Sequence, residues 1–250
     1  MRTLHERTDE RERPRVPRPT RAHAPRNRRA MTRLRLFTLC AASVLAPGGR
    51  QPAPAAEAAI QCGNLIYGVN HTSRCFSDEF LSAAQNMTTI PTERRFKSVK
   101  LGSDELFTYP FVVMTGEASF HLSARDRDNL KRYLTSGGFL LASAGCSNED
   151  WDRSFRREIK AIFGSAALKP LPMDHPLFHT VHKVEKLELH HAAEEARLQG
   201  LEVGGKVVAV YSPHGLNDTA HTEGCCCCGG NEVSNSLEVN VNILVYALMH

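Results

Sequence analysis

The sequence has no cluster of basic residues over its larger part. Residues 1–30 carry ten arginines and four acidic residues, and residues 31–59 carry three arginines and one glutamate, so a net charge of +4 leaves −4 from Ile60 onward. A nucleic-acid-binding domain needs a basic face of its own, and no run of Lys or Arg provides one there. The charge pattern therefore argues against nucleic acid as a partner.

The first thirty residues have almost no apolar side chains and are rich in arginine and proline. Such a segment cannot bury enough surface to offset its ordering entropy, so residues 1–30 are expected to be disordered. One interpretation is a functional basic arm. The other is sequence translated upstream of a true start at Met31, and it is favoured because the residues from Met31 onward themselves resemble an N-terminus.

Residues 31–59 have the pattern of a secretory signal peptide. Arg33 and Arg35 precede an apolar stretch of eleven residues, LFTLCAASVLA, and small-x-small cleavage sites follow at 53–55 and 56–58. Eleven residues are too few to cross a membrane comfortably. The pattern predicts an exported protein, periplasmic or secreted, whose mature chain starts between Ala56 and Gln61 and contains no transmembrane segment.

The mature chain, residues 60–250, alternates between strand and helix patterns and is predicted to be a single domain. Short apolar runs predict strands, and amphipathic stretches with capping residues predict helices. This alternation predicts an α/β fold with a mostly parallel sheet and helices on both faces. Residues 165–200, rich in Pro and His, are expected to form loops with a short antiparallel excursion. The expected strands are 63–69, 94–101, 106–115, 139–144 and 203–211, and the expected helices are 77–86, 123–136, 148–163 and 239–249.

Several unusual motifs in this domain resemble a bacterial domain of unknown function, number 4159. That family resembles the class I glutamine amidotransferase-like fold, a flavodoxin-like three-layer sandwich, but the resemblance implies no established activity. It covers roughly residues 62–250. The motifs are Tyr109-Pro110-Phe111, Met114-Thr115-Gly116, Leu122-Ser123, Gly137-Gly138-Phe139-Leu140, Asp152-Arg153-Ser154-Phe155-Arg156, Leu171-Pro172 and Asp174-His175-Pro176-Leu177-Phe178.

Cys146 is the first candidate for chemistry. It follows the apolar run FLLASA and precedes a helix, and a strand-to-helix turn in an amidotransferase-like fold can present a nucleophile whose pKa the helix terminus lowers. The family pattern has small residues on both sides of the cysteine, whereas Ser147-Asn148-Glu149 follows here. A nucleophile would need a base such as His214, His221 or His175. The alternatives are a small packing residue or a disulfide partner.

The second candidate is a run of four adjacent cysteines, Cys225, Cys226, Cys227 and Cys228, with His221 four residues upstream. Thiolate and imidazole are ligands of Zn, Cu or Fe. Adjacent cysteines, however, lack the two-to-four-residue spacing of structural zinc sites. Disulfides are the alternative, and the mature chain has seven cysteines, an odd number that leaves one thiol unpaired or paired between chains.

The segment after the run KVVAVY contains His214, Asp218, His221 and the cysteines. Ligands of open α/β sheets bind at the carboxyl ends of the strands. We therefore expect these residues to lie near Cys146 and the Gly116-Glu117 turn. His175 is expected to be mainly architectural.

Three functions remain open from the sequence. The first is a non-catalytic exported binding or scaffolding domain with a Cys/His-rich loop and a possible protein partner. The second is a metal- or redox-binding protein that uses Cys225–Cys228 and His221. The third is a cysteine-dependent hydrolase or amidotransferase-like enzyme that uses Cys146. The first is expected, because the amidotransferase-like fold is often reused without its catalytic triad.

Overall fold

The structure, a computed structural model, describes residues 58–69, 76–165, 167–190, 195–217 and 232–250. The basic segment 1–30 and nearly all of the signal segment 31–59 lie outside these ranges. The same holds for the cysteine run and for His221.

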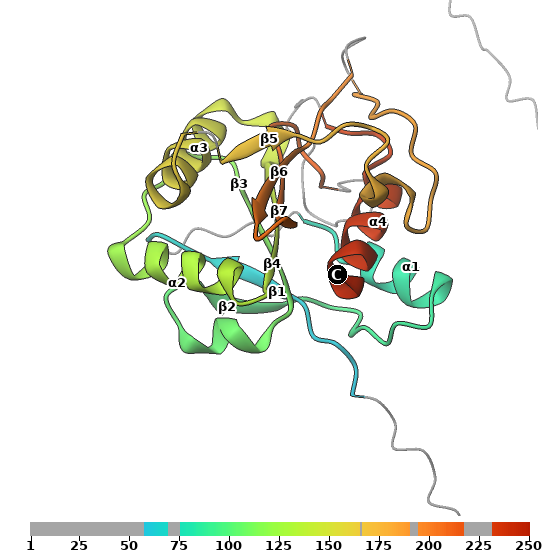
Figure 1. The fold of residues 1–250 in the computed structure, drawn as a ribbon, viewed down its shortest axis with the longest axis horizontal. Coiled ribbons are helices and arrows are strands. Elements are labelled where there is room, and N and C mark those ends of the chain that lie inside the picture. Colours follow the sequence, from blue (N-terminus) through green and yellow to red (C-terminus); the bar gives the residue numbers. More distant parts are fainter. Residues whose placement is uncertain (1–57, 70–75, 166, 191–194, 218–231) are drawn as a thin grey trace, which may run out of the picture. The chain divides into compact units, whose positions relative to one another are not determined.

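Seven strands form one sheet in the order β2-β1-β3-β4-β7-β6-β5 (Figure 1). Every pairing among β2, β1, β3, β4 and β7 is parallel, and β6 and β5 continue the sheet in antiparallel pairings. The prediction of an α/β fold with a mostly parallel sheet is confirmed. The strands are β1 (Gly63–Ile66), β2 (Lys97–Lys100), β3 (Phe111–Gly116), β4 (Phe139–Ala144), β5 (Leu168–Pro170), β6 (Gln199–Val203) and β7 (Lys206–Ser212).

The central strands β3 and β4 are buried along almost their whole length, as continuous apolar runs in a parallel sheet predict. Successive side chains alternate between the two faces, so each strand contributes to two hydrophobic clusters. One cluster lies under α1 (Glu79–Met87) and α4 (Ser236–Met249), and the other lies under α2 (Ala124–Thr135) and α3 (Glu149–Phe163). Figure 1 shows the two helix pairs on opposite sides of the sheet.

The predicted starts of α2 and α3 agree with the observed caps, whereas α4 begins at Ser236, three residues before the predicted start at 239. Ser123 and Asp126 form a reciprocal capping box at the start of α2, and the Asn148 side chain accepts a hydrogen bond from the Trp151 backbone N–H at the start of α3. Within the described ranges, no helix combines the length and the apolar character that crossing a bilayer requires.

Several predicted strand boundaries were wrong. The expected strands 63–69 and 94–101 are shorter, Gly63–Ile66 and Lys97–Lys100. Residues 106–108 of the expected strand 106–115 belong to the 3-10 helix Asp104–Thr108, because Ser103 caps the backbone at Glu105, and the strand begins only at Phe111. The expected strand 203–211 spans a hairpin. Gly204 and Gly205 adopt φ values of 60° and 80° and turn the chain from β6 into antiparallel β7.

The region 165–200 contains the expected antiparallel excursion. The short strand β5 pairs with β6 at the end of the sheet. The rest of the described residues between β5 and β6 form turns, isolated bridges and a short 3-10 helix, Pro176–His179.

Candidate functional site

The carboxyl ends of β1, β3, β4 and β7 meet at one edge of the sheet, because these strands are parallel. Glu117 follows β3, Cys146 and Ser147 follow β4, and His214 follows β7. The edge therefore gathers the chemistry-bearing side chains of three adjacent strands, as the strand pattern predicted.

Cys146 and Ser147 form a constrained turn between β4 and α3. Their φ values are 50° and 52°, in the left-handed region that non-glycine residues seldom adopt. Cys146 Sγ lies 3.6 Å from Glu117 Oε1, and Ser147 Oγ lies 3.5 Å from His214 Nδ1. Backbone conformations of this kind persist only where surrounding contacts impose them, and they concentrate at functional sites.

Cys146 is disulfide-bonded. A disulfide sulfur is not a thiolate, and only the thiolate is a nucleophile. The role of Cys146 as a nucleophile with His214 as its base stays a prediction, which now requires prior reduction of this bond. His214 lies beside Ser147, the residue after Cys146. The two predicted catalytic residues, Cys146 and His214, therefore occupy neighbouring turns at the same edge.

Two glycines allow the turns after β3 and β4 to approach each other. A Cβ on Gly116 would lie 2.5 Å from the Tyr67 hydroxyl and 2.8 Å from Trp151 Nε1. A Cβ on Gly145 would lie 3.1 Å from the Gly116 carbonyl oxygen. Any side chain at Gly116 would therefore displace the groups that hold this edge together.

The Tyr67 hydroxyl connects three elements beneath this edge. It donates a hydrogen bond to the Thr115 carbonyl oxygen over 2.9 Å and accepts one from Trp151 Nε1 over 2.6 Å. Burial raises the pKa of Tyr67, so the phenol stays protonated and keeps its donor role. The start of α3 is thereby fixed against the ends of β1 and β3.

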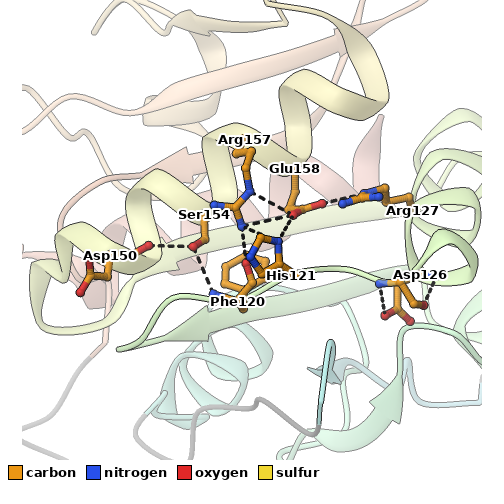
Figure 2. Close-up of polar contacts among 9 residues, drawn as sticks. Phe120, His121, Asp126, Arg127, Asp150, Ser154, Arg157 and Glu158 are labelled. Atoms are coloured by element: carbon orange, nitrogen blue, oxygen red, sulfur yellow. Dashed lines mark hydrogen bonds and ion pairs between the residues drawn. The ribbon is translucent and has the colours of Figure 1, made fainter.

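A buried carboxylate holds the segment that follows Glu117. Glu158 on α3 is 1% exposed, and Figure 2 shows it between Arg127 and Arg157, with His121 beside it. Arg127 Nε lies 2.7 Å from Glu158 Oε2, and Arg157 also donates to the Phe120 carbonyl oxygen.

Ser154 completes this attachment from the same helix. Its hydroxyl accepts a hydrogen bond from the Phe120 backbone N–H over 3.1 Å and donates to the Asp150 carbonyl oxygen over 2.8 Å (Figure 2). We interpret the Glu158 cluster and Ser154 as positioning groups for the loop between Glu117 and α2.

A second polar cluster joins α3 to β7. The Tyr211 hydroxyl donates to Asp152, which also accepts from Arg156 Nε over 2.8 Å. The guanidinium of Arg156 lies 5.0 Å from the centre of the Tyr211 ring. Burial, reinforced by Asp152, raises the pKa of Tyr211. Asp152 and Arg156 belong to the family motif Asp152-Arg153-Ser154-Phe155-Arg156, and their contacts attach α3 to β7.

The metal prediction falls outside the part of the chain that the structure describes. This applies to His221, to Asp218 and to Cys225–Cys228. Among the described residues, no group of three or more His, Cys, Asp or Glu side chains is placed to hold a metal ion. Metal binding by the cysteine run, with Zn, Cu or Fe, remains a prediction.

His175 is placed away from Cys146. Its ring lies 5.6 Å from that of Tyr246, and the Tyr246 ring faces Phe139, the first residue of β4. Cys146 follows the other end of β4, so these contacts place His175 toward the amino end of the strand. Its Nδ1 accepts a hydrogen bond from the Leu177 backbone N–H, which agrees with the expected architectural role.

The sequence analysis missed a set of buried polar side chains at the carboxyl edge. Thr115 and Ser143 occupy the last but one position of β3 and β4, and Asn217 follows β7. All three are at most 2% exposed. Within the described residues, Thr115 Oγ1, Ser143 Oγ and both polar atoms of Asn217 have no hydrogen-bond partner. In the sequence, a hydroxyl at the end of an apolar run looks like an ordinary small strand residue.

A comparison with curated proteins finds no match. The model of a protein family described as a domain of unknown function, DUF4159, matches residues 62–248. This match covers the whole sheet and the four α-helices described above, except for the last residue of α4. The resemblance inferred from the motifs is confirmed at the level of the family, and the chain belongs to the DUF4159 family.

Proposed function

We propose that residues 60–250 form an exported, non-catalytic binding domain whose ligand site is the carboxyl edge of β3, β4 and β7. The observation that carries the proposal is the left-handed turn at Cys146 and Ser147, which lies beside Glu117 and His214. Open α/β sheets bind their ligands outside the carboxyl ends of the strands.

The disulfide at Cys146 favours binding over catalysis. It leaves no thiolate at the position where an amidotransferase-like fold would carry its nucleophile. An oxidised cysteine also suits an exported protein, because disulfides persist in oxidising compartments. Export itself rests on the signal pattern from Met31 and is part of the proposal.

A compound screen by thermal shift tests the binding function. Compounds that raise the melting temperature of the wild-type protein are measured again on His214→Ala and on His182→Ala, a control histidine in the loop after residue 179. Binding at the edge requires that the shift disappears in His214→Ala and persists in His182→Ala. Shifts that survive in His214→Ala place the ligand elsewhere and overturn the proposed site.

A cysteine-dependent hydrolase is the second candidate, favoured by the position of Cys146 at a strand-to-helix turn with His214 beside the next residue. Its test is ester or amide hydrolysis by the reduced protein, with Cys146→Ser as the control. We expect no hydrolysis above the Cys146→Ser background. Turnover that appears on reduction and is lost in Cys146→Ser would replace binding with catalysis.

A further inference from the structure

Near the carboxyl ends of three neighbouring strands, one row of paired residues carries hydroxyl side chains in place of apolar ones. Thr115 pairs in register with Ser143, and Ser143 pairs with Ser212. Register partners on neighbouring parallel strands point to the same face of a sheet. The three hydroxyls therefore form one row across β3, β4 and β7.

The residues two positions earlier on each strand identify the face of the sheet toward which the row points. Two residues earlier, Val113, Leu141 and Val210 belong to the hydrophobic cluster under α1 and α4. Side chains alternate along a strand, so the hydroxyl row points to that same side.

Asparagine side chains extend this row. Asn240 of α4 donates from Nδ2 to the Leu216 carbonyl oxygen over 2.9 Å, which places it at the segment that leaves β7. Asn217 is the next residue of that segment. The Ser212 hydroxyl accepts from the His214 backbone N–H over 3.2 Å, so the row continues into the turn that carries the His214 side chain.

Most of these buried polar atoms lack partners. Within the described residues, Thr115 Oγ1, Ser143 Oγ, Asn240 Oδ1 and both side-chain polar atoms of Asn217 make no hydrogen bond. A buried polar atom without a partner costs free energy. Such atoms are expected where a ligand or ordered water completes their hydrogen bonds. Their concentration at one edge points to a ligand.

The chemistry of these atoms restricts the ligand. Hydroxyl and amide groups are uncharged and both donate and accept, and the row contains no Lys or Arg. Without a cationic side chain, the row offers no partner for the charge of an anionic ligand.

We propose that the carboxyl edge binds an uncharged, polyhydroxylated ligand of the saccharide type through Thr115, Ser143 and Asn217. This inference rests on the proposed binding function and specifies its ligand class. Saccharide hydroxyls donate and accept together, so one ligand can complete the hydrogen bonds of several of these atoms at once.

The first test needs no ligand and compares two buried serines. Ser143 has no described hydrogen-bond partner, whereas Ser154 bonds to the Phe120 N–H and to the Asp150 carbonyl oxygen. Ser143→Ala and Thr115→Val are expected to leave the melting temperature unchanged or raised, because they remove unsatisfied groups. Ser154→Ala is expected to lower it by at least about 2 °C. A comparable loss in Ser143→Ala would make its hydroxyl a structural group and overturn the inference.

The second test is saturation-transfer NMR with glucose, galactose, mannose and N-acetylglucosamine as uncharged probes, AMP as an anion and spermidine as a cation. At least one saccharide is expected to bind, and Ser143→Ala and Asn217→Ala are expected to weaken it at least about tenfold, a loss of the size that unpaired polar contacts produce. Ser154→Ala, where folded, is expected to keep the affinity.

The outcomes separate the ligand class from the binding function. Binding of AMP or spermidine without any saccharide overturns the ligand class, while the edge site stands if His214→Ala abolishes that binding. Absence of saccharide binding also overturns the ligand class. Saccharide binding that is unaffected by Ser143→Ala and Asn217→Ala overturns the assignment of the residues.

Discussion

Trp151 Nε1 donates a hydrogen bond to the Tyr67 hydroxyl over 2.6 Å, across 84 residues of sequence. The same hydroxyl donates to the Thr115 carbonyl oxygen. One phenol thus holds the indole at the start of α3 and the end of β3, directly beneath the turn that carries Cys146. This contact therefore joins the ends of β1 and β3 to the start of α3.

Replacing Tyr67 with Phe is expected to lower the free energy of unfolding by about 1–3 kcal/mol, because the buried indole N–H loses its acceptor. Urea unfolding followed by far-ultraviolet circular dichroism measures the change, because a variant without Trp151, the single tryptophan of the chain, has no tryptophan fluorescence to follow. The double variant Tyr67→Phe/Trp151→Phe is expected to lose less unfolding free energy than the two single variants lose together. Additive losses would show that the two side chains are not coupled.

Replacing Arg127 with Ala is expected to lower the melting temperature more than replacing Arg153 with Ala. Arg127 pairs with Glu158, which is 1% exposed, whereas Arg153 pairs with Glu149 and Asp150 at the surface. Exposed ion pairs contribute little to stability, whereas a buried carboxylate that loses a partner destabilises the folded state. Differential scanning calorimetry compares the variants. Equal melting temperatures would contradict the positioning role of the Glu158 cluster.

Acid is expected to destabilise the domain in part through His175. Burial lowers the pKa of His175 below its ordinary value of 6.5, and the neutral ring accepts the hydrogen bond from Leu177 N. The unfolded chain therefore binds a proton more readily than the folded chain. The contribution of His175 to stability is complete above about pH 6.5 and is lost as the pH falls toward its folded pKa.

The variant His175→Asn keeps a side chain that can cap the backbone and removes the titrating group. The drop in melting temperature between pH 7.5 and pH 5 is expected to be smaller in this variant than in the wild type. His182→Asn removes a histidine of the same region without changing this cap. If the melting temperatures of His175→Asn and of the wild type fall equally between pH 7.5 and pH 5, His175 does not contribute to the destabilisation by acid.

Cys62 is expected to resist alkylation in the folded protein. Burial raises the pKa of its thiol to about 12, so almost no thiolate is present at pH 8. Peptide mapping after iodoacetamide treatment should find Cys62 unmodified in native buffer and modified in guanidinium chloride. Rapid labelling in native buffer would mean that the start of β1 opens readily.

The fold was predictable for the strands that are buried on both faces of the sheet. The runs FVVM and FLLASA became β3 and β4, since only a central strand of a covered sheet tolerates apolar residues on both faces. The capping box at Ser123 marked the start of α2 correctly. The hairpin at Gly204-Gly205 was missed, because the apolar pattern on either side of the glycines continues through them.

The site was predictable only in part. The strand pattern correctly predicted that His214 and Glu117 would lie near the Cys146 turn, because carboxyl ends of parallel strands share an edge. The Tyr67–Trp151 bond and the partnerless hydroxyls of Thr115 and Ser143 depend on which atoms meet in three dimensions. Periodicity and composition contain no such information.

The two outermost strands of the sheet limit how a partner can bind. The outermost strands are β2, with exposed Lys97 and Lys100, and the three-residue β5, with Lys169 and Pro170. Lysines and a proline on short edge strands prevent another chain from adding a strand of its own, because the charges repel and Pro170 offers no N–H. Association by sheet extension is thus disfavoured on both sides, which is consistent with the ligand site proposed at the carboxyl ends of the strands.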